Sequence, residues 1–263
     1  MSTLYEQKAA AALEHLGLAT ALEHLDQSAQ RAAAESWSFS HFLGYLLDGE
    51  LQERRRKTVK LNLQFAHFPY IKRLEEFDFA SQPSIDRRLV DELATGRFLG
   101  EGRNIVFLGN PGVGKTHLAI SLGVIAAELE HRVYFTSAIE MARRLAKALA
   151  ENRLSREMNN LTRPKLLVID EVGYLALEPV QASLLFQVIS NRYERRNPIV
   201  LTSNKAFGDW GQVFAGDPVM ASAALDRLLH RCTVISIRGE SYRLKEKRLA
   251  GTQTAGALAR DSQ

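Results

Sequence analysis

Residues 109–116 read GNPGVGKT, and this stretch decides the fold that we expect. It fits the pattern G-x-x-x-x-G-K-[S/T], which forms a phosphate-binding loop between a strand and a helix. The apolar run at 105–108 predicts the strand, and the spacing of Leu118 and Leu122 predicts the helix. Glycines let backbone N–H groups converge on an anion, and the helix N-terminus adds partial positive charge. The residues that this loop predicts as nucleotide contacts are Gly109, Asn110, Pro111, Gly112, Val113, Gly114, Lys115 and Thr116.

Two side chains of this loop have separate predicted roles. Lys115 is expected to reach the β- and γ-phosphates of a nucleoside triphosphate, and the Thr116 hydroxyl is expected to ligate Mg²⁺. The sequence therefore predicts a nucleoside triphosphate and Mg²⁺ as the bound cofactors.

Polar side chains end two later strands. Residues 166–171 read LLVIDE, and such a run delivers Asp170 to the carboxyl edge of an open α/β sheet, where ligands bind. We expect Asp170 in the Mg²⁺ shell, and Glu171 to orient and polarise a water toward the γ-phosphate. Residues 201–204 read LTSN, and we expect Asn204 to hydrogen-bond the attacking water or the γ-phosphate. A guanine-reading N-K-x-D motif would need Asp at position 207, where the chain has Phe207, so this signature of a GTPase is missing.

Two arginines follow near the C-terminal end of the chain, Arg227 and Arg243. A guanidinium group can stabilise the charge on a transferring phosphoryl group, either in cis or from a neighbouring subunit. The chemistry alone leaves a surface ion pair equally open for each of them.

Strand and helix patterns alternate from residue 104 onward. The short apolar runs that predict strands are residues 105–108, 133–136, 166–169, 199–202 and 234–237. This alternation indicates an α/β fold, with a five-stranded, mainly parallel sheet flanked by helices. Another helix is expected at 85–98.

The chain divides by pattern into three predicted segments. Residues 1–70 are expected to form a small all-helical N-terminal domain, residues 71–250 one ATPase domain, and residues 251–263 a flexible tail. In the first segment, Thr3 and Glu6 fit a capping box, and apolar residues from Phe39 to Leu51 predict a helix-packing stripe.

The composition excludes several classes of protein. The chain has 263 residues, of which 46% are hydrophobic and 24% charged, so it is not a disordered chain. Cys232 is the only cysteine, which excludes an intramolecular disulfide. The sequence has neither an apolar run of membrane-spanning length nor a secretory signal, so we expect a cytoplasmic protein without a membrane partner. The net charge of +4 permits nucleic-acid contact without requiring it.

Basic residues gather in two places, and two interpretations are open for both: a solvated helix surface, or contact with DNA phosphates. We favour DNA contact for the stretch between residues 140 and 165, which alone carries seven basic and three acidic residues. The candidate DNA-binding residues are Arg54, Arg55, Arg56, Lys57, Arg143, Arg144, Lys147 and Arg153.

In this order the motifs resemble those of the AAA+ ATPases. Among these, the chain is similar to the IstB family, the ATP-binding helper proteins of insertion sequences, which are related to the DnaC helicase loaders. The segments that carry the resemblance are LEEFDF (74–79), GNPGVGKTH (109–117), LLVIDEVGY (166–174), LTSNKAFGDW (201–210), ALDRLLHR (224–231) and IRGESYRLK (237–245).

The resemblance implies ATP as the nucleotide and adds His117 to the cofactor-binding residues. It implies that Asn204 is the first sensor, that Arg243 is a second sensor acting in cis, and that Arg227 is an arginine finger acting on ATP of the adjacent subunit. The expected partners are double-stranded target DNA, further copies of the chain in an ATP- and DNA-dependent homo-oligomer, and the transposase of the same element. The segment 77–79 is a candidate for adenine contact.

Three other functions stay open from the sequence. The chain could instead load a replicative helicase, act as a P-loop kinase on a small molecule, or bind DNA with a purely structural nucleotide site. The kinase hypothesis leaves Glu171 beside Asp170 without a role, and a structural site predicts no hydrolysis.

Overall fold

The computed structural model describes residues 4–242, and the chain divides into two compact units between Leu61 and Asn62. The predicted domain boundary after residue 70 stays a prediction. Arg243, half of the predicted capping box (Thr3) and the predicted tail at 251–263 lie outside the described residues. No helix within residues 4–242 combines the length and the apolar character that crossing a membrane requires.

The first unit contains α1 (Leu4–His15), α2 (Ala19–Ala34) and most of α3 (Phe39–Phe65). Its sequence predicts an apolar stripe that packs between helices, but of that stripe only Leu46 is buried, whereas Phe39 is 95% exposed. The buried residues of α2 are Ala21 and Ser28, those of α3 are Leu46 and Glu50, and α1 has none among its described residues.

A carboxylate from α3 caps the N-terminus of α2. Leu18 has no side chain that can cap the helix, and Glu50, 5% exposed, accepts the N–H groups of Thr20 and Ala21 at 2.8 and 3.1 Å. An acidic group at a helix N-terminus satisfies free N–H groups and complements the helix dipole. Arg54 donates to Glu50 and to the carbonyl of Gly17, both at 2.8 Å, and so fixes the cap to the α1–α2 turn.

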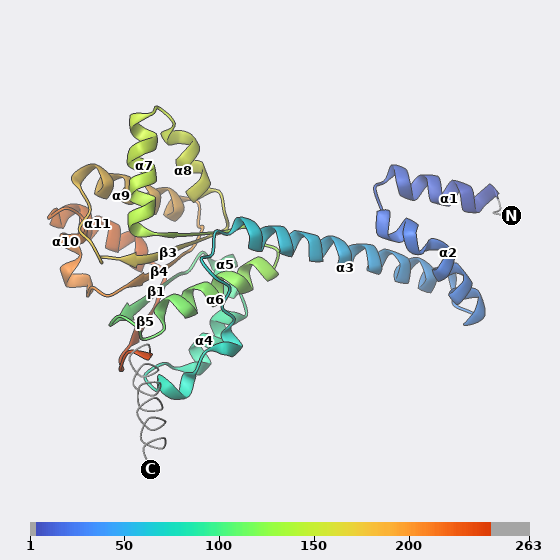
Figure 1. The fold of residues 1–263 in the computed structure, drawn as a ribbon, viewed down its shortest axis with the longest axis horizontal. Coiled ribbons are helices and arrows are strands. Elements are labelled where there is room, and N and C mark those ends of the chain that lie inside the picture. The colour runs from blue at the N-terminus through green and yellow to red at the C-terminus, as the bar shows by residue number, and fades with distance from the viewer. Residues whose placement is uncertain (1–3, 243–263) are drawn as a thin grey trace, which may run out of the picture. The chain divides into compact units, whose positions relative to one another are not determined.

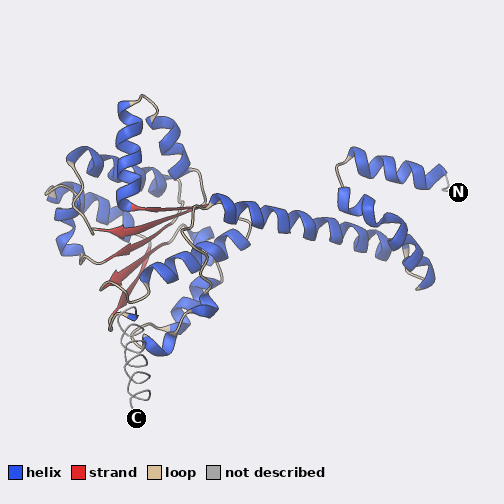
Figure 2. Ribbon diagram, viewed as in Figure 1, coloured by secondary structure: helices blue, strands red, loops and turns tan. Residues whose placement is uncertain are grey.

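The second unit is built on the predicted parallel sheet (Figure 2). Its strands are β1 (Asn104–Gly109), β2 (Val133–Ser137), β3 (Leu166–Val172), β4 (Ile199–Ser203) and β5 (Cys232–Ile237). Every neighbouring pair is parallel, and the order across the sheet is β2-β3-β4-β1-β5. The predicted α/β fold is therefore confirmed.

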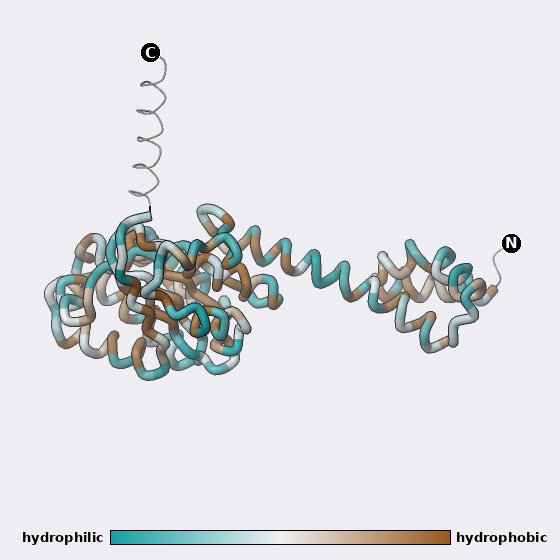
Figure 3. The backbone as a smooth tube through the Cα atoms, turned by 90° about the horizontal axis from the view of Figure 1, so that it is seen from below, coloured by the Kyte–Doolittle hydropathy of each residue, from teal (hydrophilic) through white to brown (hydrophobic). Residues whose placement is uncertain are grey.

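Helices cover both faces of this sheet, as alternating side chains on buried parallel strands require (Figure 1). Ile105 and Phe107 pack with α4 (Arg87–Ala94), α5 (Arg97–Glu101) and α6 (Lys115–Glu128). Val106 faces the other layer, which contains α7 (Ala138–Ala150), α8 (Leu154–Thr162), α9 (Pro179–Glu194), α10 (Trp210–Val213) and α11 (Pro218–Leu229). Hydrophobic residues accordingly gather in the interior of the unit (Figure 3).

The helix expected at 85–98 is wrong as a single element, because the structure has α4 and α5 in its place. Gly96 separates them with a φ of +76°, a left-handed conformation that ends one helix and begins the next. Short 3₁₀ turns at Leu74–Glu76, Phe79–Ser81 and Phe207–Asp209 complete the described elements.

A fully buried arginine on α9 ties several segments together. Arg192 is 0% exposed, and burial lowers its pKa to about 9, so it stays protonated at neutral pH. Its guanidinium donates to backbone carbonyls at the end of α8 and just before β3 and β4, namely those of Leu161, Pro164, Lys165 and Pro198, at 2.7 to 3.1 Å. One side chain thereby bonds four carbonyl groups, from the end of α8 and from the two loops that precede β3 and β4.

We expect Arg192→Met to lower the free energy of unfolding by about 3–5 kcal/mol, because methionine fills space but removes the guanidinium donor from these four carbonyls. Urea unfolding followed by circular dichroism measures the change. Arg195→Met, at the exposed end of the same helix, is the matched control and should stay within about 0.5 kcal/mol of the wild type. If the two variants unfolded at the same urea concentration, a stabilising role of Arg192 would be contradicted.

Candidate nucleotide-binding site

The candidate site lies at the carboxyl edge of the sheet, where parallel strands end together. β1 leads into the glycine-rich loop and α6, and β3 carries Asp170 and Glu171 just before its last residue, Val172. β4, which ends just before Asn204, lies between β1 and β3. The strand order therefore brings three motifs that are distant in sequence to neighbouring positions on one edge.

Two glycines of the loop are required by its packing. Gly112 and Gly114 have φ values of +82° and +98°, which side chains rarely adopt. A Cβ at Gly114 would lie 2.6 Å from the Phe77 ring, and one at Gly112 would overlap Ser241. The loop is thus enclosed by residues from before β1 and after β5.

Lys115 and Thr116 begin α6 at the end of this loop. Lys115, 8% exposed, donates its ammonium group to the carbonyls of Gly109 and Asn110, both at 2.8 Å. An ammonium group held within the loop can turn toward phosphate oxygens without crossing solvent. Contact of Lys115 with the β- and γ-phosphates stays a prediction.

Thr116 and Asp170 present oxygen ligands to one point. The Thr116 hydroxyl lies 3.0 and 3.1 Å from the two carboxylate oxygens of Asp170. Hydroxyl and carboxylate oxygens suit Mg²⁺, which usually takes few protein ligands and completes its shell with water and phosphate oxygens. These two residues fit the predicted metal, and no cluster of three or more His, Cys, Asp or Glu able to hold a metal occurs among the residues described.

Asn204 has an unsatisfied group at the same edge. Its Oδ1 is buried and has no hydrogen-bond partner among the described residues. A buried polar atom without a partner costs free energy, so such an atom commonly marks a ligand or water site. The observation fits the expected contact of Asn204 with the attacking water.

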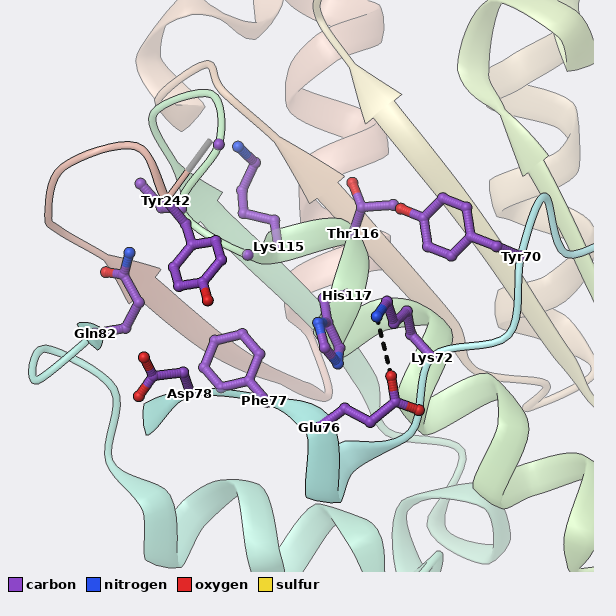
Figure 4. A pocket seen from close by; sticks show the side chains of 13 residues that line it. Tyr70, Lys72, Glu76, Phe77, Asp78, Gln82, Lys115, Thr116, His117 and Tyr242 are labelled. Atoms are coloured by element: carbon purple, nitrogen blue, oxygen red, sulfur yellow. Dashed lines mark hydrogen bonds and ion pairs between the residues drawn. The ribbon is translucent and has the colours of Figure 1, made fainter. Parts of the chain in front are cut away.

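A pocket of about 350 Å³ opens beside the glycine-rich loop (Figure 4). Phe77 and His117 pack edge to face with ring centres 5.2 Å apart, and Tyr242 faces them across the pocket. His117 Nε2 lies 3.0 Å from the carbonyl of Arg73, which can only accept, so this nitrogen carries the proton. Aromatic walls beside a phosphate loop suit a stacked purine base.

The sequence analysis missed several residues of this pocket, among them Gln82 and Tyr242. Gln82 donates to the carbonyl of Glu240 at 3.2 Å, and the Tyr242 N–H donates to the carbonyl of Gly112 at 3.0 Å. Both contacts join segments more than a hundred residues apart, and a pattern of local spacing cannot reveal them.

Arg227 lies away from this edge. It is on α11, donates to the carbonyl of Ala223 at 2.9 Å, and shares a pocket with Asn104, the first residue of β1. The glycine-rich loop follows the last residue of β1, about 16 Å along a six-residue strand. The structure therefore separates Arg227 from the loop of its own chain.

Three of the predicted DNA-binding residues of α3 pair with glutamates of their own helix, namely Arg54, Arg56 and Lys57. Arg54 holds the α2 cap described above, and Arg56 and Lys57 pair with Glu53 at 2.7 and 3.5 Å. DNA contact by Arg54, Arg55, Arg56 and Lys57 stays a prediction.

The predicted DNA-binding residues Arg143, Arg144, Lys147 and Arg153 differ in whether they pair with an acidic side chain. Arg144 pairs with Glu157 at 2.6 Å and donates to the Tyr134 hydroxyl, and Arg153 pairs with Glu151. Burial raises the pKa of Tyr134, which therefore stays a neutral hydrogen-bond partner at neutral pH. A basic hollow of about 330 Å³ is lined by Arg144, Lys147, Arg153 and Arg156, together with Glu151 and Glu157. Arg143 is exposed on α7.

The strand order, the glycine-rich loop after β1 and the polar ends of β3 and β4 define the second unit as an AAA+ P-loop domain. Solved structures with this fold include a DnaC helicase loader, with a TM-score of 0.50 and 22% identity, covering 57% of this chain and 87% of that one. Another is the replication initiator DnaA bound to AMPPCP and single-stranded DNA, with a TM-score of 0.53 and 23% identity, covering 68% and 54%. These likenesses concern the fold alone.

The chain belongs to the family of IstB-like ATP binding proteins, whose model matches residues 9–250. It is 46% identical over 242 residues to the insertion sequence IS21 ATP-binding protein of Pseudomonas aeruginosa, covering 92% of this chain and 89% of that protein. It is 44% identical over 234 residues to the IS5376 counterpart of Geobacillus stearothermophilus, covering 89% and 92%. The predicted family is therefore confirmed.

Proposed function

We propose that this protein binds and hydrolyses ATP with Mg²⁺, assembles on target DNA, and assists the transposase of an insertion sequence. The convergence of Lys115, Asp170, Glu171 and Asn204 on one sheet edge carries this proposal. The relatives support its biological setting, because their names place them in insertion sequences and call them ATP-binding.

The chain's own side chains account for binding and hydrolysis. Lys115 and the N–H groups of the loop bind the phosphates and offset their negative charge. The base binds in the part of the pocket that is lined by Phe77. Thr116 and Asp170 would hold Mg²⁺, which when bound neutralises charge on the β- and γ-phosphate oxygens. Glu171 polarises the attacking water, and Asn204 hydrogen-bonds that water or the γ-phosphate.

The position of Arg227 supports action in trans. It lies near the start of β1, whereas the phosphates bind past its end, so Arg227 is placed to serve the ATP of an adjacent copy. Each site would then be completed by a neighbour, and hydrolysis would require the oligomer. The family resemblance is the basis for proposing Arg243 as a second sensor that acts in cis.

We propose that α7 and α8 contact DNA phosphates. Arg143 and Lys147 are exposed and four residues apart, so they share one helix face. We expect the Arg143→Ala, Lys147→Ala double variant to weaken DNA binding at every sequence tested. The slope of log K against log salt should become shallower by about 1 for each phosphate that the variant no longer neutralises.

Fluorescence anisotropy at several salt concentrations measures this slope. The matched control is Arg88→Ala, Arg97→Ala, which removes two exposed charges from helices on the other face of the sheet. Equal slopes for the two double variants would reject DNA contact through α7.

Electron microscopy of the protein with double-stranded DNA and a slowly hydrolysed ATP analogue tests the assembly. Ordered oligomers on DNA that disappear without nucleotide support the proposal, and a monomer under all conditions would contradict it. Loading of a replicative helicase is the second candidate, favoured by the likeness in fold to the DnaC loader. Binding of a purified replicative helicase, and not of the element's transposase, would decide for that candidate.

A further inference from the structure

β3 contains a bulge beside β4, close to the carboxyl edge of the sheet. The register between the two strands steps from the pair Ile169–Leu201 to the pair Val172–Ser203. β3 thus has two residues in an interval where β4 has one. Bulges of this kind re-aim side chains and are frequent beside active sites.

The two residues in the bulge are Asp170 and Glu171, and the single residue opposite them is Thr202. Thr202 is 1% exposed. Its hydroxyl oxygen accepts the N–H of Glu171 at 2.9 Å, and its hydroxyl proton is donated to Asp170 Oδ1 at 2.5 Å. An N–H can only donate and a carboxylate can only accept, so both partners fix the direction of this hydroxyl group.

The backbone at Glu171 is strained. Its φ is +60°, a left-handed conformation that costs a residue other than glycine about 1–2 kcal/mol. In a regular strand, Asp170 and Glu171 would point to opposite faces of the sheet. Here Glu171 is exposed between the buried residues Asp170 and Val172, so the bulge turns it out of the sheet.

We infer that Thr202 is a positioning residue for ATP hydrolysis, whose hydroxyl holds the bulge and sets where Glu171 lies relative to Asp170. This inference rests on the proposed ATPase function. The hydrogen bonds of the Thr202 hydroxyl go to Asp170 and Glu171, so Thr202 acts through these two acidic residues. Ser203 supports the same bulge by donating to the carbonyl of Val172 at 2.7 Å, and Asn204 follows directly on the strand.

Thr202→Val removes both hydrogen bonds at nearly constant volume. Glu171 then loses the bond that holds its strained backbone, while Lys115 and the loop stay intact. We expect kcat to fall about 100-fold, as for a displaced catalytic group. The Kd for ATP should stay within about 3-fold of the wild type, because the Thr202 hydroxyl bonds Asp170 and Glu171 and is not part of the glycine-rich loop. Thr202→Ser, which keeps the hydroxyl, should stay within about 3-fold in kcat.

The test measures steady-state hydrolysis with DNA present, and nucleotide affinity by a fluorescent ATP analogue. Thr162→Val is the matched control, because Thr162 is also 1% exposed but its hydroxyl donates to the carbonyl of Met158 on α8. Its kcat should equal that of the wild type. If the valine variant at 202 does not fold, Thr202→Ala gives the same comparison.

Three results would overturn the inference: an unchanged kcat in Thr202→Val, a loss of ATP affinity as large as the loss of kcat, or a serine variant as slow as the valine variant. A wild-type protein that binds ATP but does not hydrolyse it would reject the proposed ATPase function, and the positioning role with it. The wild-type measurement thus distinguishes the two failures.

Discussion

Lys115→Ala should weaken ATP binding by about 100-fold or more, because charge-assisted hydrogen bonds to phosphate contribute about 1.5–3 kcal/mol each. Lys115 is buried at the start of α6, and its ammonium group lies within the glycine-rich loop. Alanine has no group that could replace it there. Isothermal titration calorimetry with ATP and Mg²⁺ measures the loss.

Lys60→Ala is the control for this variant, since it removes an exposed lysine from α3 in the other unit. It should bind ATP as the wild type does. Wild-type affinity in Lys115→Ala would reject the assignment of the loop as a phosphate cradle. Circular dichroism spectra of both variants verify that the fold is retained.

Arg227→Ala should bind ATP normally but lose about 10³-fold in DNA-stimulated hydrolysis, the usual effect of removing an arginine finger. Glu171→Gln should also bind ATP and lose hydrolysis. Mixed oligomers of the two variants should regain activity, because a subunit that keeps Glu171 can lie beside one that keeps Arg227. In a random equal mixture, about a quarter of the sites would be complete.

Coupled-enzyme assays of each variant alone and of mixtures in varied ratio measure the recovery. As a control, Glu171→Gln is mixed with the double variant Arg227→Ala, Glu171→Gln, which offers no complete site. Recovery in the first mixture alone supports completion of the site in trans. The same low rate in both mixtures would argue against it.

The glycine-rich loop and the ends of β3 and β4 could be predicted because their signals are local. The eight residues of the loop include the groups that bind phosphate, and a short apolar run indicates a strand. The order of strands could not be predicted, since each pairing joins residues that are far apart in sequence. The family resemblance supplied the expected role of Arg227 in trans. Only the structure shows that Arg227 lies far from the glycine-rich loop of its own chain.

Other features of the structure could not be predicted, because no pattern of neighbouring residues in the sequence indicates them. Arg54 is one of four consecutive basic residues, which suggested DNA contact, yet its partner Glu50 caps a helix that begins thirty residues earlier. Thr202 was part of a recognised motif, but its role depends on a bulge in the neighbouring strand. In both cases the decisive contact is a side chain bonding to backbone groups of another element.

The place of β1 in the sheet also bears on how the protein is synthesised. Within residues 4–242, β1 pairs with β4 and β5 alone, and the register of Ile105 with Val200 and Thr233 shows that these partners are translated 95 and 128 residues after it. The strand that leads into the glycine-rich loop therefore has no strand partner during much of translation. Long-range parallel pairing of this kind folds slowly. A nascent chain would thus acquire its nucleotide pocket late, after most of the protein has been made.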